Sequence, residues 1–456
     1  MAVTYENAVE RLIALGHELA THRKFDLEHM RVLAAALGHP ERRLQSVLIA
    51  GTNGKGSTAA TLASIVQTAG YRTGLYTSPH LVRVNERIRV NGEPISDAEF
   101  ALMYDRVERV SQELVATSAL PWHPSFFEML TAIMFEYFAS VGVELAVLEV
   151  GMGGRLDATN IAEPSISVIT DIDFDHQKFL GNSLSEIARE KAGIIRPNGT
   201  VILLPQHPQV NDTLGNEIMA RKAHPISATE YMPPLTPGAP NGHRTGESFQ
   251  KGTFPVSIGG EEILISPSLP GRHQLRNLAL AIAAAQELNQ FGLRILPRHI
   301  EQGVRETKWP ARFQVIPAEP GSPEIVLDVA HNPAGAWALR STLSERYEER
   351  PLTFVFGAMR DKALEEIAGI LFPVAERVIL TKAQNPRAAS PEELMQAAQQ
   401  TGATLLDEPN VAAGLECARK LAGSSGVIVI TGSIYIVGEV LEQLSSKPAQ
   451  QGAKHG

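Results

Sequence analysis

The stretch Ala50-Gly51-Thr52-Asn53-Gly54-Lys55-Gly56-Ser57-Thr58 lies between an apolar run at 47–49 and a helical stretch at 59–69. A strand that passes through a glycine-rich turn into a helix presents backbone N–H groups at the helix N-terminus, and these groups attract phosphate. Lys55 adds a cation for the outer phosphates of a nucleotide, and the hydroxyl of Ser57 or Thr58 can face a metal ion. The stretch therefore predicts a phosphate-binding turn.

The sequence of this turn differs from that of the standard P-loop. The standard motif would place glycine at position 49 and serine or threonine at position 56, where this chain has Ile49 and Gly56. A generic glycine-rich turn is the alternative interpretation. The strand and the helix that flank the turn favour the phosphate-binding interpretation.

The composition is that of a soluble globular protein, with 44% hydrophobic and 20% charged residues in a chain of 456 residues, enough for two or three domains. The net charge of −9 argues against a nucleic-acid partner, which usually requires a basic surface. The single cysteine, Cys417, excludes an internal disulfide and a cysteine-built zinc site. Neither a signal peptide nor an apolar run of the roughly 20 residues that span a membrane is evident, so we expect a cytoplasmic protein without a membrane partner.

Short β-branched runs alternate with helical stretches along most of the chain. In the first part, strands are predicted at 45–50, 73–76, 145–150 and 165–170. Helical periodicity covers 6–37, 98–115 and 127–140. This alternation predicts a doubly wound, mainly parallel sheet. Beyond it come an irregular proline-rich stretch at 232–243, a β-rich patch at 253–265 and a helix at 273–289.

A domain boundary is predicted around Lys308-Trp309-Pro310, because the alternation of strands and helices starts again beyond it. The strands predicted there are 324–329, 352–356, 377–380, 404–406 and 427–431. The predicted fold is thus α/β, with a P-loop doubly wound domain at 1–307 and a smaller Rossmann-like domain at 308–445. A flexible tail is predicted at 446–456.

Polar side chains follow several strands of the first part. Ser78 comes after the strand at 73–76, Glu149 ends the next strand, and Asp171, Asp173, Asp175 and His176 follow the strand at 165–170. The carboxyl ends of parallel strands meet at one edge of a sheet, so a hydroxyl, a carboxylate and an imidazole can converge there on Mg²⁺. Imidazole is an unusual magnesium ligand. Ser78 could instead shape a turn before Pro79, and the aspartates could form a solvated loop.

Two further segments carry candidate chemistry. Lys191 lies in a helical segment at 185–195, where a lysine is usually a solvated surface charge. In the second part, Asp328 leaves a strand and precedes His331-Asn332-Pro333, an arrangement suited to a contact with the hydroxyls of a ribose. An Asn-Pro turn with an accidental aspartate is the alternative.

The ordered set of segments resembles the motifs of folylpolyglutamate synthases and dihydrofolate synthases of the bacterial bifunctional type, members of the Mur ligase superfamily. The resemblance extends from about 40 to 440. The segments that carry it are 51–58, 77–81, 148–160, 175–181, 189–194, 271–277, 309–314 and 328–333. One departure is Ala311, where the family usually has glycine, and another is a long proline-rich excursion at 206–250.

The resemblance implies ATP contacts from Asn53, Gly54, Lys55, Gly56, Ser57, Thr58, Asn277, Arg312, Asp328 and His331. It implies Mg²⁺, expected as two ions, bound by Ser78, Glu149, His176 and a carbamylated Lys191. The catalytic residues implied are Lys55, Lys191, His176 and Arg312, the last acting on the phosphates from the second domain. A pterin is implied at Ser125, Phe126, Phe127, Glu128, Leu156, Asp157 and Ala158. A monovalent cation is a further possible cofactor, and a monomer is typical of the family.

The predicted function is that of an ATP-dependent ligase that adds L-glutamate to a folate-type carboxylate through an acyl phosphate. Dihydropteroate is an expected second substrate, and no side-chain nucleophile is required. A peptidoglycan-precursor ligase is one alternative, although the chain has no room for a uridine-nucleotide domain before Gly51. A nucleotide switch that does not ligate is another, although it would not need the segments around Lys191 and Asp328.

Overall fold

The computed structural model describes residues 3–16, 27–233, 252–320 and 322–446. The predicted tail beyond Ser446 and most of the predicted irregular stretch at 232–243 lie outside these residues. Contacts divide the chain into two compact units. The first comprises Met1–Pro79, Val84–Ser268 and His273–Trp309, and the second His80–Arg83, Leu269–Arg272 and Pro310–Gly456.

The first unit is built on an eight-stranded sheet with the order β4-β3-β2-β5-β1-β6-β7-β8. The strands β2, β5, β1, β6, β7 and β8 pair in parallel, and β3 and β4 add an antiparallel edge. This confirms the predicted doubly wound, mainly parallel sheet. The strand bounds are β1 Gln45–Ala50, β2 Thr73–Tyr76, β3 Ile88–Val90, β4 Glu93–Pro94, β5 Leu145–Glu149, β6 Ile166–Ile169, β7 Thr200–Leu203 and β8 His224–Ser227.

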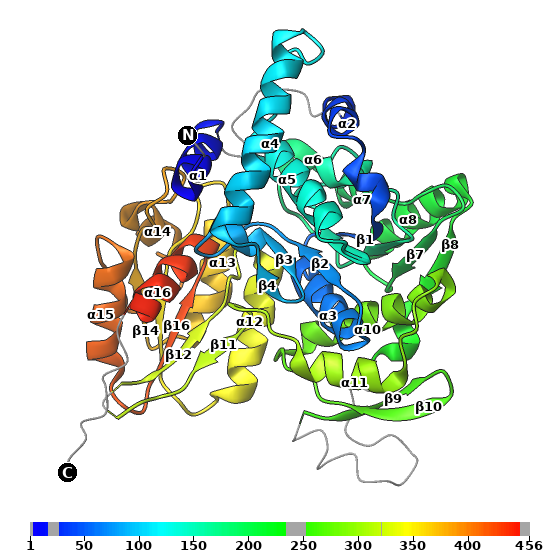
Figure 1. The fold of residues 1–456 in the computed structure, drawn as a ribbon. Coiled ribbons are helices and arrows are strands. Elements are labelled where there is room, and N and C mark those ends of the chain that lie inside the picture. Colours follow the sequence, from blue (N-terminus) through cyan, green and yellow to red (C-terminus); the bar gives the residue numbers. More distant parts are fainter. Residues whose placement is uncertain (1–2, 17–26, 234–251, 321, 447–456) are drawn as a thin grey trace, which may run out of the picture. The chain divides into compact units, whose positions relative to one another are not determined.

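Helices cover both faces of this sheet (Figure 1). One buried apolar cluster lies under α1, α2, α4, α5, α7 and α8, and the other under α3, α10, α11 and the hairpin β9–β10. The helices are α1 Tyr5–Ala14, α2 Leu27–Ala36, α3 Lys55–Thr68, α4 Asp97–Ala116, α5 Phe126–Ser140, α6 Gln177–Leu180, α7 Leu184–Ala192, α8 Pro208–Arg221, α10 Arg272–Glu287 and α11 Pro297–Glu306. The hairpin strands are β9 Phe254–Ile258 and β10 Glu261–Ile265.

Local sequence explains where several helices begin. Ser96, Ser125 and Ser183 each accept a hydrogen bond from the backbone three residues on, and the glutamate at that position returns one. This capping box satisfies two N–H groups that a helix start otherwise leaves unpaired. The described part of the predicted excursion at 206–250 also holds regular structure, namely α8, β8 and the 3₁₀ helix η4.

The second unit contains a six-stranded sheet with the order β11-β12-β16-β13-β14-β15. All its pairs are parallel except β11 with β12, which agrees with the predicted Rossmann-like domain. The strands are β11 Gln314–Ile316, β12 Glu324–Leu327, β13 Leu352–Phe356, β14 Arg377–Leu380, β15 Leu405–Asp407 and β16 Val427–Thr431. The sequence did not predict β11.

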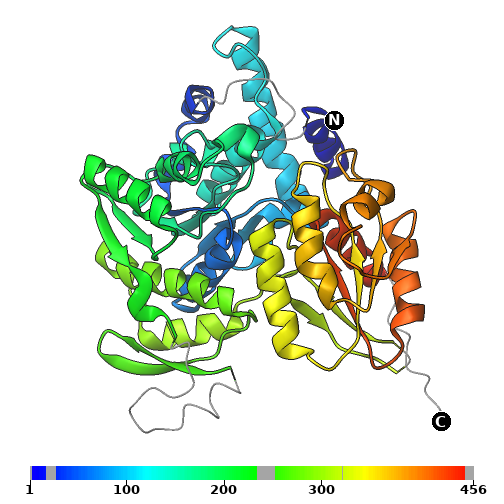
Figure 2. The same ribbon diagram turned by 180° about the vertical axis from the view of Figure 1, so that it is seen from behind.

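Two buried clusters fill the faces of this second sheet, one under α12, α13 and α14 and the other under α15 and α16. Figure 2 shows α12 and α13, in yellow to orange, running along one face. The helices are α12 Pro333–Arg346, α13 Leu364–Leu371, α14 Pro391–Ala397, α15 Val411–Ala422 and α16 Ile434–Ser446. The 3₁₀ helices of the chain are η1 Pro40–Arg43, η2 Val84–Arg87, η3 Ala158–Ile161, η4 Ala228–Tyr231, η5 Leu288–Phe291 and η6 Phe372–Val374. Of the helices described, none has both the length and the apolar character needed to cross a bilayer.

Candidate functional site

The predicted phosphate turn connects β1 to α3, and α3 begins at Lys55. Its backbone is fixed by the segment that follows β6. The N–H groups of Thr52 and Asn53 donate to the carbonyl of Asp171 at 2.8 and 3.2 Å. The hydroxyl of Thr52 donates to the carbonyl of Asp173 at 2.9 Å and accepts from its N–H at 3.0 Å. The turn is therefore held in one shape by main-chain contacts.

Two glycines of the turn allow close approach. A Cβ on Gly51 would lie 1.8 Å from the hydroxyl oxygen of Thr170, and one on Gly54 would lie 2.1 Å from Oδ1 of Asn277. Both glycines also have positive φ angles, of 156° and 89°. Since no other residue tolerates these positions without strain, the glycines bring the backbone of the turn against its neighbours. This packing places Asn277, a predicted ATP contact, directly against the turn.

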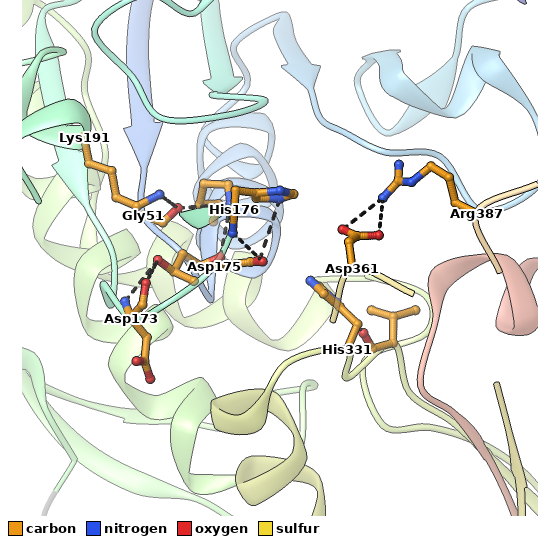
Figure 3. A network of polar contacts seen from close by, with 11 residues as sticks. Gly51, Asp173, Asp175, His176, Lys191, His331, Asp361 and Arg387 are labelled. Atoms are coloured by element: carbon orange, nitrogen blue, oxygen red, sulfur yellow. Dashed lines mark hydrogen bonds and ion pairs between the residues drawn. The ribbon is translucent and has the colours of Figure 1, made fainter. Parts of the chain in front are cut away.

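Two lysines meet at one carbonyl oxygen of the turn. Lys55 Nζ donates to the carbonyls of Gly51 and Thr52 at 3.1 Å each, and Lys191 Nζ donates to that of Gly51 at 2.7 Å. Figure 3 shows the Lys191 amine directed at Gly51. Lys191 is only 4% exposed, so the interpretation of this residue as a solvated surface charge is wrong. Burial, with a smaller effect of the Lys55 charge, lowers the pKa of Lys191 to about 7.

A buried carboxylate lies at the end of β5. Glu149 is 4% exposed and accepts a hydrogen bond from the N–H of Ser78 at 3.2 Å, so these two predicted metal ligands lie together. This is expected from the parallel pairing of β2 and β5. His176 lies just before α6, with Nε2 3.8 Å from Oδ2 of Asp175, as Figure 3 also shows. The convergence of His176 on Ser78 and Glu149 stays a prediction.

The two predicted pterin segments meet at Gly151. A Cβ on this glycine would lie 2.6 Å from Cζ of Phe127 and 3.2 Å from Oδ2 of Asp157. Asp157 is buried and accepts from the N–H of Met152 at 3.0 Å and from the hydroxyl of Thr159 at 2.6 Å. Burial raises the pKa of Asp157 to about 6. The carboxyl group of Asp157 is therefore fixed near the ring of Phe127.

The remaining pterin candidates have mainly packing contacts. Ser125 and Glu128 form the capping box of α5, and Glu128 also accepts from Nδ1 of His29 at 3.1 Å. Phe126 is buried beneath the guanidinium of Arg87, 5.2 Å from the ring centroid. Leu156 is half-buried and Ala158 is buried. These contacts explain how α5 and the segment at 156–158 are positioned.

In the second unit, Asp328 follows β12 and is 8% exposed. Its carboxylate accepts from the N–H groups of Phe313 and Ala330 at 2.8 and 2.9 Å. Burial raises the pKa of Asp328, and the charge of Arg312 opposes this effect. Arg312 Nη1 donates to its neighbouring carbonyl of Ala311 at 3.2 Å. Asp328 and Arg312 are thus close to one another.

His331 follows the same strand and has a defined orientation. Its Nδ1 lies 2.9 Å from the carbonyl of Val329, and since a carbonyl only accepts, Nδ1 must carry the proton. The second unit also contains an ion pair between Arg387 Nη2 and Asp361 at 3.0 Å, drawn in Figure 3. The Arg387 guanidinium opposes the effect of burial and holds the pKa of Asp361 below its usual value.

Comparison with known proteins identifies the family. Residues 127–285 match the Mur ligase middle domain, and residues 311–434 match the Mur ligase glutamate ligase domain. The dihydrofolate synthase/folylpolyglutamate synthase of Bacillus subtilis is 33% identical over 92% of this chain and 94% of its own length. The chain belongs to the dihydrofolate synthase/folylpolyglutamate synthase family.

Solved structures of the dihydrofolate synthase/folylpolyglutamate synthase family agree with this assignment. FolC of Escherichia coli in complex with DHPP and ADP superposes with a TM-score of 0.83 and 27% identity, covering 98% of this chain and 99% of that one. The folylpolyglutamate synthase of Mycobacterium tuberculosis with ADP has a TM-score of 0.82 and 31% identity, covering 97% and 100%. A bifunctional member from Yersinia pestis was solved with AMPPNP and a Mn ion; its TM-score is 0.80 at 26% identity, with coverage of 96% and 98%.

The donor set of this family member suits a divalent cation. Among the described residues, there is no group of three or more His, Cys, Asp or Glu side chains that could hold a metal ion. However, the carboxylate of Glu149 and the segment of Ser78 offer oxygen ligands, which hard cations prefer. Within the same described part, the buried hydroxyl of Thr58 has no hydrogen-bond partner. An unpaired buried hydroxyl at the start of α3 fits a turn shaped for a ligand.

Several residues that support the site in this family member were missed or left open by sequence reasoning. Asp171 was left open between a place among the polar side chains at the sheet edge and a solvated loop, and Arg276, Gly151 and His29 received no role. Arg276 directly precedes Asn277 in a motif segment, which was a usable signal. Nothing in the local pattern pointed to His29, because its partner Glu128 is 99 positions away.

Proposed function

We propose that this chain is an ATP-dependent ligase that joins L-glutamate to a folate-type carboxylate, with ATP first converting that carboxylate into an acyl phosphate. The observation that carries the proposal is the match to named dihydrofolate synthase/folylpolyglutamate synthases over nearly the whole chain. The phosphate turn and the buried Lys191 support it, because a non-ligating nucleotide switch has no use for a buried lysine beside its phosphates.

The residues divide the chemistry as follows. The backbone of the phosphate turn and Lys55 would bind the phosphates, and Asn277 would contact the nucleotide from α10. Arg312, Asp328 and His331 are proposed as the contribution of the second unit to the nucleotide. Amide formation from a carboxylate and an amine needs an activated carboxylate but no enzyme nucleophile, so these groups act by positioning and neutralising charge.

Ser78, Glu149 and His176 would hold Mg²⁺, two ions being expected, and a monovalent cation is possible. Bound Mg²⁺ supplies charge neutralisation at the phosphates. Lys191 would contribute after carbamylation, which replaces a cation with an anionic oxygen ligand. Addition of carbon dioxide requires a neutral amine, and the pKa of Lys191, lowered to about 7 by burial, provides one near neutral pH.

We further propose that the enzyme accepts dihydropteroate as well as folates that already carry glutamate. Support comes from the meeting of Phe127 and Asp157 at Gly151, which offers a ring face and a hydrogen-bonding carboxylate to a pterin. We also propose that the enzyme acts as a monomer in the cytoplasm, where its expected substrates, ATP and L-glutamate, are abundant.

The test measures phosphate release by the purified full chain with ATP and Mg²⁺, while L-glutamate and either dihydropteroate or tetrahydrofolate are added or omitted. We expect phosphate release to require both co-substrates and to match a product heavier by one glutamyl residue in mass spectra. Lys55→Ala serves as the inactive control. ATP hydrolysis that is indifferent to both co-substrates would contradict the ligase proposal. Activity with tetrahydrofolate but not with dihydropteroate would contradict only the second activity.

A further inference from the structure

Asp171 joins two elements of the first unit through different groups. Its carbonyl accepts the N–H groups of Thr52 and Asn53 in the phosphate turn, at 2.8 and 3.2 Å. Its carboxylate accepts from Arg276 on α10, with Nε at 2.9 and 3.0 Å and Nη2 at 2.6 Å. One residue therefore connects the phosphate turn to the first turns of α10.

Further hydrogen bonds connect Arg276 and the segment after β6 to residues 205 and 206. Nη2 of Arg276 also donates to the carbonyl of Pro205 at 2.9 Å. The side chain of Gln206 accepts from the N–H of Ile172 at 2.7 Å and donates to the carbonyl of Thr170 at 3.2 Å. Arg276 and Gln206 thus also hold the segment that follows β6.

The position of α10 matters because of the residue that follows Arg276. Asn277 is 5% exposed and donates from Nδ2 to Oε1 of Gln274 at 2.9 Å. Oδ1 of Asn277 lies only 2.1 Å from the position that a Cβ on Gly54 would take. A small shift of α10 would therefore separate Asn277 from the turn or make the two overlap.

We propose that the ion pair between Asp171 and Arg276 is a positioning device for nucleotide binding, which sets the phosphate turn and Asn277 in register before the nucleotide arrives. This inference rests on the proposed nucleotide site. The side chains of Asp171 and Arg276 are 37% and 29% exposed, so this ion pair adds little to global stability. The effect of the ion pair on the conformation of the phosphate turn is local. A binding site that is preorganised in its bound conformation binds its ligand more tightly.

The experiment compares Asp171→Asn, Arg276→Gln and the charge-reversed double variant Asp171→Arg with Arg276→Asp. ADP affinity is measured by calorimetry, and KM for ATP, kcat and Tm are measured on the same preparations. Each single variant should weaken ADP binding and raise KM for ATP by about tenfold, with kcat within about twofold. The double variant should restore ADP affinity to within about threefold of wild type, because the carbonyl of residue 171 is present in every variant.

Asp105→Asn is the matched control, since Asp105 also pairs with an arginine, Arg109, at 3.1 Å but lies on α4. It should leave ADP affinity unchanged. Single variants that bind ADP like wild type would overturn the inference. So would variants in which ADP affinity falls only together with Tm and is not restored by charge reversal, because the pair would then be merely structural. A wild-type chain that does not bind ADP would overturn the proposed nucleotide site itself, whatever the variants do.

Discussion

At the scale of the residue, Lys191 shows how burial changes the chemistry of a side chain. An exposed lysine is almost fully protonated at neutral pH, and the protonated amine does not react with carbon dioxide. Lys191 is 4% exposed and lies near Lys55, and the resulting lowering of its pKa to about 7 leaves much of the amine neutral. The residue is therefore suited to carbamylation by its surroundings.

Replacing Lys191 by methionine should remove the anionic ligand without leaving a cavity. We expect kcat to fall about 10²- to 10³-fold, by analogy with the removal of one charge-stabilising group. Tm should stay equal or rise, because the variant no longer buries an amine. Steady-state kinetics and calorimetry check this, and addition of bicarbonate should reactivate carbon-dioxide-depleted wild type but not the variant. Full activity of Lys191→Met would contradict the proposed role.

Residues inside contiguous motifs were predictable from the sequence, and residues paired across the fold were not. Gly51 and Lys55 could be identified because a strand, a turn and a helix follow one another locally. Arg276 meets Asp171 across 105 positions, and no spacing rule connects the two. Pairings of this kind depend on which strands and helices become neighbours, so they appear only in the folded chain.

At the scale of the element, the segment that leads into α5 is held by histidines. Nε2 of His123 lies 3.0 Å from the carboxylate of Glu108 on α4, and Nδ1 lies 2.9 Å from the carbonyl of Pro124. Both partners are acceptors, so both ring nitrogens donate only when the imidazole is protonated. The hydrogen bond with Glu108 raises the pKa of His123 above its ordinary value of 6.5.

The stability that His123 provides should therefore depend on pH. A raised pKa in the folded state gives a contribution that is complete below the ordinary value of 6.5 and is lost as pH rises through the folded pKa. His123→Asn should cost about 0.5–1 kcal/mol more at pH 6 than above the folded pKa, a value reduced for partial solvent exposure. Urea denaturation of both proteins between pH 5.5 and 9 checks this. A difference that grows with pH would contradict it.

The packing of α11 on α3 depends on one glycine. A Cβ on Gly303 would lie 2.5 Å from Cα of Ile65, so the two helices contact each other through their backbones. Gly303→Ala should destabilise the protein by about 1–3 kcal/mol through overpacking. Gly215→Ala on α8, where no atom lies within 4 Å of the added methyl group, is the control and should be neutral or stabilising by about 0.5–1 kcal/mol. Equal effects of the two substitutions in thermal unfolding would refute this account.

At the scale of the whole molecule, the buried parallel strands were the most predictable part of the fold. Their continuous apolar runs are visible in the sequence, as at β1, β5 and β16. The sequence analysis did not predict β7 and β8 of the first sheet, nor the short strands β3, β4 and β11. These lie at or near the sheet edges, and β8 is mostly exposed, so no apolar pattern marks it.

Substitution of Arg312 tests whether the second unit takes part in catalysis. We expect Arg312→Ala to lower kcat about 10²- to 10³-fold, because a charge on the transferring phosphate would be lost. ADP affinity should change much less, because the phosphate turn and Lys55 are intact. Kinetics and calorimetry on the same variant separate the two effects. Wild-type kcat in Arg312→Ala would exclude this arginine from the reaction.

The carbonyl oxygen of Gly51 accepts hydrogen bonds from two lysines, and this sharing has a thermodynamic consequence. A triphosphate that attracts Lys55 adds negative charge near Lys191 and draws the competing cation away, so the proton affinity of Lys191 must rise. Before carbamylation, nucleotide binding near pH 7.5 should therefore take up protons from the solution. The apparent binding enthalpy would then vary with the ionisation enthalpy of the buffer, and this dependence should disappear in Lys191→Met.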